Sequence, residues 1–486
     1  MGLPDNLQPR LLWGYFWEVC CIPRPSKKEE KIINYLTDFA RKNNLAYKRD
    51  KAGNVLISKP AAKNMEKRRT VILQSHIDMV CEKNSDINHD FENDPIEPFI
   101  DDGWVKAKGT TLGSDDGIGI AAQLAVLASD EIEHGPVECL FTVDEETGLT
   151  GASALSADFM SGKTLLNLDS EDEGELFIGC AGGKDTVAYF NFDRVDVIHG
   201  ASTYKISISG LKGGHSGDDI DKGLGNSNKI LCRLLWNAAK KFDLRLCIFD
   251  GGNLRNAIPR EAYSIVMVPE RFRTDFNTYI DNAGIDIKNE YSVTEPQLKI
   301  SIEETSTPHF LIDEDTQSKL LNSLYSCPHG VITMSQSIDG LVETSTNLAS
   351  VKYADVNRII VTTSQRSSVD SARESAAEMA ESVFLLAEAE VEHSEGYPGW
   401  TPNTASHILN ICVDSYKRLF GTEPKVRAIH AGLECGLFLK KYPYLDMISF
   451  GPTIKGAHSP DERLNIDSVT RFWKLLLDVL KNMPAG

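Results

Sequence analysis

The sequence predicts an α/β protein in which a mostly parallel sheet, flanked by helices, is interrupted by an inserted α+β domain. Strand-like apolar runs alternate with helical patterns up to Asp169 and again after Pro402, an order typical of a parallel sheet. In between, the pattern changes to strands alternating with longer helices. A chain of 486 residues is also too long for one core. We therefore expect one domain in two segments, 1–187 and 396–486, and an inserted domain at 188–395.

The first segment opens with a predicted helix. Ser26-Lys-Lys-Glu29 has the pattern of a capping box, and the residues after it place an apolar stripe on one helical face. A glycine-rich loop at Gly109–Gly119 then leads into a helix of small residues at Ile120–Ala128. The stripe residues are Ile32, Ile33, Leu36, Phe39 and Ala40, and the expected strands are Asn54–Ser58, Val71 onward, Val137–Val143 and Leu165–Asp169.

The inserted domain contains a weak internal repeat, which we call the echo. Asn256-Ala-Ile-Pro-Arg-Glu-Ala precedes one predicted strand, and Asn347-Leu-Ala-Ser-Val-Lys-Tyr precedes another at a similar place. This suggests two related halves. The expected strands are Thr203–Ser209, Tyr263–Val268, Leu298–Glu303 and Asn357–Thr363, and the expected helices are Asn226–Lys241, Asp313–Tyr325 and Val369–Ala389. After this domain we expect a strand at Met447–Phe450 and a closing helix at Val469–Leu480.

Composition and charge disfavour several classes of partner. A hydrophobic content of 41% and a charged content of 25% are ordinary for a globular protein. The net charge of −19 repels phosphate backbones and anionic lipid, so we expect no nucleic acid and no membrane partner. No apolar run approaches the roughly 20 residues that span a bilayer. Ten cysteines without a Cys-x-x-Cys arrangement, and no signal-like start, indicate reduced thiols and a cytoplasmic location.

The run Val71–Val80 brings two polar side chains to the end of a predicted buried strand. His76 and Asp78 stand two positions apart, so an extended backbone places both on the same face. A metal-bound imidazole usually donates its second N–H to a carboxylate. The pair can therefore supply a ligand and its orienting partner, although a lone His-x-Asp is more often a surface hydrogen bond.

Other potential ligands follow separate strands or lie in the glycine loop. Open α/β sheets bind ligands at the carboxyl ends of their strands. Imidazoles and carboxylates without cysteine suit Zn²⁺, Mn²⁺ or Co²⁺. The set exceeds one tetrahedral site and is sufficient for two metals if one carboxylate bridges them. These residues are His76, Asp115, Glu145, Glu146, Asp169 and His458.

The adjacent Glu145 and Glu146 suggest a division of roles. Neighbours in an extended segment point in opposite directions, so one can coordinate metal while the other faces the attacking water as general base. The alternative is that Asp144-Glu-Glu is only a solvated turn.

These features resemble a known family. The order His-x-Asp, Asp in a glycine loop, Glu-Glu, Asp and a late His is similar to the di-zinc aminoacylase/carboxypeptidase/dipeptidase superfamily. Nearly the whole chain resembles its bacterial aminoacyl-histidine dipeptidases. The motifs that carry this closer resemblance are Gly109-Thr-Thr-Leu-Gly-Ser-Asp-Asp-Gly-Ile-Gly, Leu211-Lys-Gly-Gly-His-Ser-Gly, Asn253-Leu-Arg-Asn-Ala-Ile-Pro-Arg-Glu-Ala and His430-Ala-Gly-Leu-Glu-Cys-Gly.

The resemblance implies a zinc exopeptidase-like catalytic domain, an inserted lid and two divalent metal ions. By resemblance, His76 and Asp169 hold one metal, Glu146 and His458 hold the other, and Asp115 bridges them. Zinc is the expected metal, with manganese and cobalt as alternatives.

The resemblance also implies roles for residues next to the ligands. Asp78 would orient His76, and Glu145 would act as general base. We further expect a cis peptide between Asp115 and Asp116. At Asp116 this chain departs from the family, which usually has asparagine there, and the extra acid could alter metal preference.

Substrate-binding residues are expected in the lid. A planar guanidinium binds a carboxylate bidentately, and Arg366 lies at the end of the strand predicted at Asn357–Thr363. The resemblance adds His215 as a donor to the developing oxyanion, Asn256 as a backbone or carboxylate contact, and Gly432, from the catalytic domain, as a position of close approach. The alternative for Arg366 is a surface charge.

The function that the resemblance implies is metal-dependent hydrolysis of Xaa-His dipeptides, including β-alanyl-histidine. Alternatives are a broader dipeptidase and an N-acyl amino-acid deacylase, since nothing in the residues alone selects histidine. A non-catalytic metal-binding protein would be expected to have lost Glu145 or a ligand. The oligomeric state stays open, because relatives of this type also form homodimers, whereas a doubled lid could replace a partner's lid.

Overall fold

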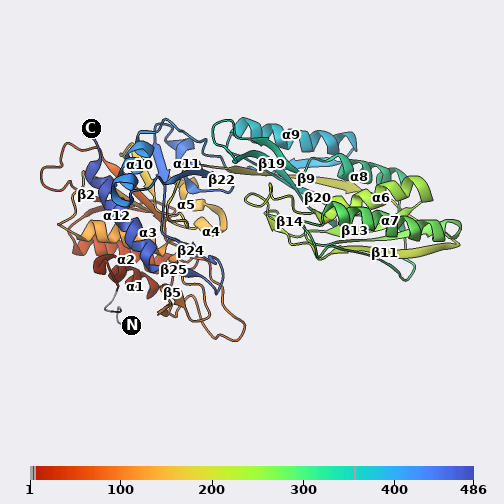
Figure 1. The fold of residues 1–486 in the computed structure, drawn as a ribbon, viewed down its shortest axis with the longest axis horizontal. Helices are drawn as coiled ribbons and strands as arrows, with labels where there is room; N and C mark the ends of the chain where they lie inside the picture. The colour runs from red at the N-terminus through yellow and green to blue at the C-terminus, as the bar shows by residue number, and fades with distance from the viewer. Residues whose placement is uncertain (1–3, 5–6, 355–356) are drawn as a thin grey trace. The chain divides into compact units, whose positions relative to one another are not determined.

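The computed structural model describes residues 4, 7–354 and 357–486. Over these residues the chain divides into two compact units (Figure 1). The first unit contains the described residues up to Gly179, together with Trp400–Ala428 and Leu433–Gly486, and the second contains Cys180–Gly399 and Ile429–Gly432. The predicted boundaries at 187/188 and 395/396 thus fall inside the second unit. This unit also takes residues 396–399 and 429–432 from the predicted C-terminal segment.

The first unit is built on a sheet with the strand order β1-β2-β6-β3-β7-β23-β8-β22. Parallel pairing is concentrated at its centre, where β3 lies between β6 and β7 and β23 continues beyond β7. All residues of β3 are buried, as expected for a parallel strand covered on both faces. The α/β class is confirmed. The strands are β1 Ala46–Arg49, β2 Val55–Lys59, β3 Val71–His76, β6 Val137–Thr142, β7 Thr164–Asn167, β8 Glu175–Cys180, β22 Lys425–Ile429 and β23 Asp446–Ser449.

Helices pack against this sheet through apolar faces. In α2 the predicted stripe from Ile32 to Ala40 is buried, but the capping box is wrong. The helix begins at Glu30, Ser26 does not cap it, and the Ser26 hydroxyl instead donates to Asp78. The helices of this unit are α1 Arg10–Cys20, α2 Glu30–Lys42, α3 Ser114–Ala128, α4 Glu145–Gly148, α5 Thr150–Ala154, α10 His407–Phe420, α11 Glu434–Lys441 and α12 Ile466–Asn482.

A smaller antiparallel sheet, in the order β24-β25-β5-β4, lies in the same unit. Its strands are β4 Pro98–Asp101, β5 Trp104–Ala107, β24 Ile454–Lys455 and β25 Arg463–Asn465. In the described part of the chain, no helix is both long and apolar enough to cross a membrane.

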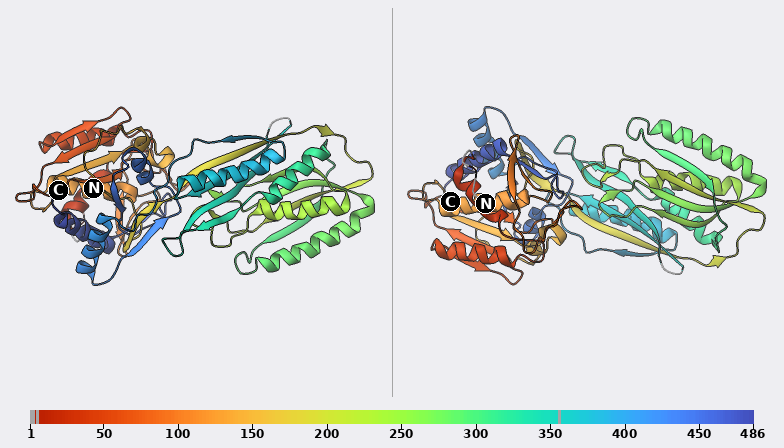
Figure 2. Two further views of the ribbon diagram at one scale, coloured as in Figure 1. Left: turned by 90° about the horizontal axis from the view of Figure 1, so that it is seen from above. Right: turned by 90° about the horizontal axis from the view of Figure 1, so that it is seen from below.

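The second unit has an antiparallel sheet in the order β16-β11-β15-β13-β19-β20-β9-β21, with β18 on β19. Burial alternates along β11, and the helices lie along one face of the sheet (Figure 2). The strands are β9 Gly182–Asn191, β11 Ala201–Ser209, β13 Arg245–Gly251, β15 Ala262–Pro269, β16 Lys299–Glu304, β18 Gly330–Met334, β19 Val342–Ala354, β20 Arg358–Ser367 and β21 Glu390–His393. The helices are α6 Ser227–Phe242, α7 Arg273–Glu290, α8 Glu314–Ser326 and α9 Asp370–Leu386, with a 3₁₀ turn at Glu270–Phe272.

This sheet consists of two antiparallel arms that meet where Gly251 of β13 pairs with Val351 of β19. That the two arms are related halves stays a prediction. In the second copy of the echo, Asn347–Tyr353 itself lies inside β19, and the strand that follows it is β20. Two short pairs complete the unit: β12 Gly214–His215 with β14 Ala257–Ile258, and β10 Arg194–Val195 with β17 Leu311–Ile312.

Candidate active site

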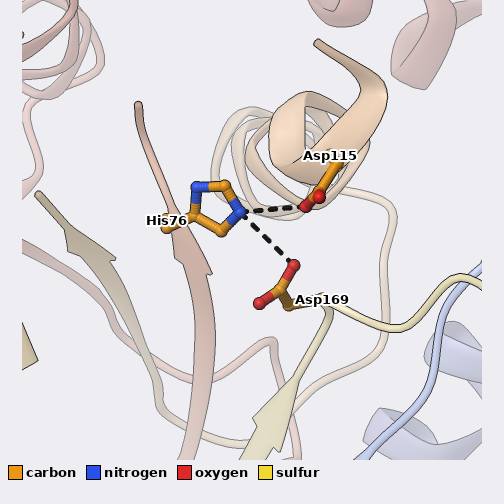
Figure 3. A group of neighbouring side chains, drawn as sticks. All are labelled: His76, Asp115 and Asp169. Atoms are coloured by element: carbon orange, nitrogen blue, oxygen red, sulfur yellow. Dashed lines mark hydrogen bonds and ion pairs between the residues drawn. The ribbon is translucent and has the colours of Figure 1, made fainter. Parts of the chain in front are cut away.

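The first unit brings the predicted metal ligands together at the carboxyl end of its parallel strands. His76 is the last residue of β3, Asp169 follows β7, and Asp115 lies in the first turn of α3. Figure 3 shows the three side chains pointing toward one another. The Nε2 atom of His76 lies 3.0 Å from Oδ1 of Asp115 and 3.4 Å from Oδ1 of Asp169.

A second imidazole faces the other oxygen of Asp115. The Nε2 atom of His458 lies 3.1 Å from Oδ2 of Asp115 and 3.2 Å from Oε2 of Glu146. Asp115 therefore presents one oxygen to each imidazole, and each imidazole faces a further carboxylate. This is the arrangement that a bridging carboxylate between two cations requires. We call His76, Asp115, Glu145, Glu146, Asp169 and His458 the carboxylate–imidazole cluster.

Glu145 and Glu146 do not lie in an extended segment. They open the short helix α4 after Asp144, whose φ is 50°, so the argument from alternating strand directions is wrong. Ligand atoms of Glu145, Glu146 and His76 nevertheless lie within 4.8 Å of one another. The tight turn after β6 brings both carboxylates to the same place.

Asp78 holds this turn against the end of β3. Its Oδ1 lies 3.4 Å from Nδ1 of His76 and accepts from the backbone N–H of Glu145 at 3.0 Å. Its Oδ2 accepts from the N–H of Glu146 at 3.2 Å and from Ser26 Oγ at 2.8 Å. Burial would raise the pKa of Asp78, but His76 and these donors lower it to about 2. Asp78 is thus an anion that reaches an imidazole and both glutamate backbones.

The cluster has more negative charge than its imidazoles balance. Burial raises the pKa of Glu145, His76 opposes this, and Asp169 raises it further. Burial also acts to raise the pKa of Asp115, but hydrogen bonds from His458 and His76 hold it well below its usual range. The buried Oε1 of Glu146 has no hydrogen-bond partner within the described residues. Crowded oxygen and nitrogen ligands with an unpartnered carboxylate oxygen fit divalent cations.

The expected cis peptide between Asp115 and Asp116 is present. The Oδ1 of Asp116 accepts from the N–H of Gly119 at 3.1 Å. Burial and the nearby Asp169 raise the pKa of Asp116 well above its usual value. A Cβ at Gly119 would collide with this carboxyl group, which explains the glycine there.

Sequence reasoning missed two buried charged residues that hold the glycine loop. Glu462 accepts from the N–H groups of Leu112, Gly113 and Ser114 at 2.7–2.9 Å. Arg24 donates to the carbonyls of Asp78 and Gly113, and so ties the end of β3 to the same loop. Arg24 carries no motif in the sequence, whereas Glu462 stands four residues after His458.

Sequence reasoning also missed buried acids around the ligands. Burial and Asp115 raise the pKa of Glu171 to about 8. Burial raises the pKa of Glu434 to about 7 against the opposing effect of His76. Glu434 accepts from Nε2 of Gln74 at 2.6 Å. Gln74 lies on β3, two residues before His76.

The second unit gathers a different set of polar groups around one buried arginine. Arg366 of β20 is 7% exposed. It donates from Nε to Ser216 Oγ at 3.3 Å and from Nη1 to Tyr397 Oη at 3.1 Å, and its Nη2 lies 3.5 Å from His215 Nε2. No carboxylate among the described residues forms an ion pair with it. We call Arg366, His215, Ser216 and Tyr397 the guanidinium cluster.

Backbone contacts fix the tautomer of His215. Its Nδ1 accepts from the N–H groups of Gly217 and Asp218 at 3.3 and 3.2 Å, so the proton of a neutral ring lies on Nε2. Burial and the adjacent Arg366 lower the pKa of His215. The ring is therefore a neutral N–H donor directed from Nε2.

The other two predicted substrate-binding residues lie beside this cluster. Gly432 was expected in the catalytic domain but belongs to the second unit. The backbone carbonyl of Asn256 accepts from the N–H of Ser216 at 2.8 Å, and the Asn256 side chain is exposed. A Cβ at Gly432 would lie 2.8 Å from Cε2 of the Tyr397 ring. Gly432 is therefore a close-approach position toward Tyr397, a residue that sequence reasoning did not assign to the site.

The chain is similar to known peptidases. The profile of Peptidase family M20/M25/M40 matches residues 72–482. Cytosol non-specific dipeptidase of Escherichia coli (strain K12) is 44% identical over 481 residues, which is 99% of each chain. The crystal structure of aminoacylhistidine dipeptidase from Vibrio alginolyticus superposes with a TM-score of 0.92 at 45% identity, covering 99% of this chain and 98% of that one. A tripeptidase from Staphylococcus aureus shares the fold at 16% identity and a TM-score of 0.57, covering 99% of each chain.

Proposed function

Because the chain belongs to peptidase family M20/M25/M40, we propose that it is a metal-dependent dipeptidase with a preference for Xaa-His dipeptides, including β-alanyl-histidine. The observation that carries this proposal is the sharing of Asp115 between His76 and His458, each of which faces another carboxylate. The names of the relatives at 44% and 45% identity, a dipeptidase and an aminoacylhistidine dipeptidase, support the substrate class.

The proposed ligands divide between two ions. His76 and Asp169 hold one ion, Glu146 and His458 hold the other, and Asp115 contributes an oxygen to each. The donor set suits Zn²⁺, with Mn²⁺ or Co²⁺ as alternatives. When bound, such ions supply Lewis acidity, which polarises a scissile carbonyl and acidifies the attacking water. The unpartnered Oε1 of Glu146 supports its place among the ligands.

Glu145 is the proposed general base. Asp78 holds the Glu145 backbone N–H at 3.0 Å and so fixes the start of α4. Burial first, and then the charge of Asp169, raise the pKa of Glu145, and a raised pKa makes a carboxylate a better proton acceptor near neutral pH. Glu145 takes a proton from the attacking water and passes it to the leaving amine.

The guanidinium cluster is proposed to recognise the rest of the substrate. Arg366 binds the free carboxylate of the dipeptide through its planar fork. The Nε2–H of His215 donates to the oxygen on which negative charge develops. Asn256 and Gly432 border this region as a backbone contact and a close-approach position. The proposal requires the second unit to act as a lid that closes on a substrate held by the first.

A dipeptide panel tests this function. The metal-reconstituted protein should release amino acids from Ala-His and β-alanyl-histidine, and a chelator should stop the reaction. The name of the Escherichia coli relative favours a second candidate, a dipeptidase of broad specificity, which equal rates on Ala-Leu and Ala-His would support. Turnover of N-acetyl-histidine without turnover of any dipeptide would instead indicate a deacylase. Cytosolic location is part of this proposal and is tested by fractionation, and light scattering decides between a monomer and a homodimer.

A further inference from the structure

We propose that Tyr397 is a positioning residue, which fixes the guanidinium of Arg366 for binding the free α-carboxylate of the substrate. This inference rests on the proposed function, since it concerns the same carboxylate. Tyr397 follows the last strand of the second unit, outside every motif that carried the family resemblance.

The charge of Arg366 is available for an anion. The side chain is almost fully buried, and its nitrogens face the neutral groups Ser216, Tyr397 and His215. Buried arginines are normally paired with acids, because an unpaired buried charge is costly. An arginine surrounded by neutral groups instead is suited to receive a carboxylate from a ligand.

The Tyr397 hydroxyl is the closest of these groups and has a second hydrogen bond to give. Its oxygen accepts from Arg366 Nη1 at 3.1 Å. A phenol that accepts through oxygen keeps its own O–H as a donor. Burial raises the pKa of Tyr397 despite the opposing charge of Arg366, so the hydroxyl keeps its proton. Tyr397 can therefore orient the guanidinium and also donate to the same carboxylate.

Two glycines form a slot for the Tyr397 ring. A Cβ at Gly183 would lie 2.7 Å from Cε1 of the ring, and a Cβ at Gly432 would lie 2.8 Å from Cε2. These atoms belong to opposite edges of the ring, so both positions exclude any side chain. Gly432 thus has a physical reason to be glycine that does not require direct contact with substrate.

The backbone of Tyr397 is fixed as firmly as the ring. Its N–H and carbonyl exchange hydrogen bonds with Gly183 of β9 at 2.9 and 3.0 Å. Arg373 donates a further bond to the same carbonyl and also to Asp370. A side chain held at its backbone and at both ring edges is suited to holding another group in place.

The test compares a dipeptide with its C-terminal amide in metal-loaded protein. Tyr397→Phe keeps the ring in its slot and removes only the hydroxyl. The KM for the dipeptide should rise about 10-fold, as for a lost hydrogen bond to a charged group. The kcat should stay within about twofold, and kcat/KM for the amide should not change. The matched control is Tyr189→Phe, which removes a hydroxyl bonded to Glu392 on the same sheet.

A second variant and a second measurement cover the remaining outcomes. Gly432→Ala should displace the ring and raise the same KM. Calorimetry should also measure the binding of the dipeptide and of its amide to Glu145→Gln protein, with and without Tyr397→Phe. This measurement does not depend on turnover. If the wild type hydrolyses no dipeptide, the proposed function fails, and the binding ratio still decides the role of Tyr397. Three results would overturn the inference. The first is that Tyr397→Phe changes neither the KM for the dipeptide nor the ratio of the two binding constants. The others are that the variant loses equal affinity for dipeptide and amide, or that Glu145→Gln protein with Tyr397 intact does not bind the dipeptide more tightly than the amide.

Discussion

The two polar clusters of this protein carry unbalanced charge of opposite sign. In the first unit, half-buried carboxylates outnumber the imidazoles, and the buried Oε1 of Glu146 has no hydrogen-bond partner within the described residues. In the second unit, the buried Arg366 is surrounded by neutral groups and by donors. One cluster has excess negative charge and the other has excess positive charge.

This difference indicates what each cluster binds. Excess buried negative charge is relieved by cations, and an unpaired buried guanidinium is relieved by an anion. A dipeptide presents a carbonyl that bound cations can polarise and, a few bonds away, a carboxylate that an arginine can hold. Under the proposed function, the first cluster serves catalysis and the second serves recognition.

Metal removal should have the largest effect, because it acts on the first cluster alone. Chelation should abolish peptidase activity, and Zn²⁺, Mn²⁺ or Co²⁺ should restore it, since these ions suit the donor set. Elemental analysis should find two ions per chain. One ion or none in fully active protein would show that the sharing of Asp115 has been misread.

Substitution of the paired glutamates should separate base from ligand. Glu145→Gln keeps the shape and removes the basicity, so kcat should fall at least about 100-fold with metal content unchanged. Glu146→Gln should lose metal instead. Steady-state kinetics and elemental analysis on both proteins check this, and identical behaviour of the two variants would refute the assignment.

Removing the neutral donor of the second cluster should also affect turnover. His215→Ala should lower kcat by roughly 100-fold, as for a lost oxyanion donor, with metal content unchanged. His199→Ala provides the control, because His199 is an exposed histidine of the same unit. An unchanged kcat for the His215 variant would exclude it from catalysis.

Glu462 should affect stability more than recognition. Its carboxylate accepts from three successive N–H groups of the glycine loop and from Ser114 Oγ. Glu462→Gln replaces one accepting oxygen by a donor, so the free energy of unfolding should fall by about 1–3 kcal/mol. Urea denaturation measures this, and an unchanged midpoint would mean that the loop holds its shape unaided.

Much of the first cluster could be predicted from sequence because its residues follow recognisable strands. His76 and Asp169 stand at the end of short apolar runs, and the topology of a parallel sheet brings such positions together. His458 lies further from its predicted strand, between β24 and β25. The glutamate pair was placed correctly for the wrong reason, since it lies in a helical turn. The conformation of a tight turn depends on tertiary contacts such as those of Asp78. The periodicity of apolar residues in the sequence does not predict such contacts.

The second cluster was harder to predict because its residues come from unrelated places. Tyr397 lies 31 positions from Arg366, in a segment that the sequence identifies only as a junction rich in Pro and Gly. The slot that Gly183 and Gly432 form exists only once distant segments have packed. Ser26 shows how a tertiary contact can override a local pattern. Its sequence context favours a helix cap, but its hydroxyl donates to the buried Asp78 instead.

The most direct test of the division between the clusters is the ratio of kcat/KM for a dipeptide to that for its C-terminal amide. The wild type should prefer the free carboxylate, and Arg366→Lys should reduce the ratio about 10-fold, because it keeps the charge and loses the bidentate fork. Metal content should not change, and Arg233→Lys, which alters an exposed pair with Glu290, is the control. An equal ratio in the wild type and Arg366→Lys would contradict recognition of the carboxylate by the second unit.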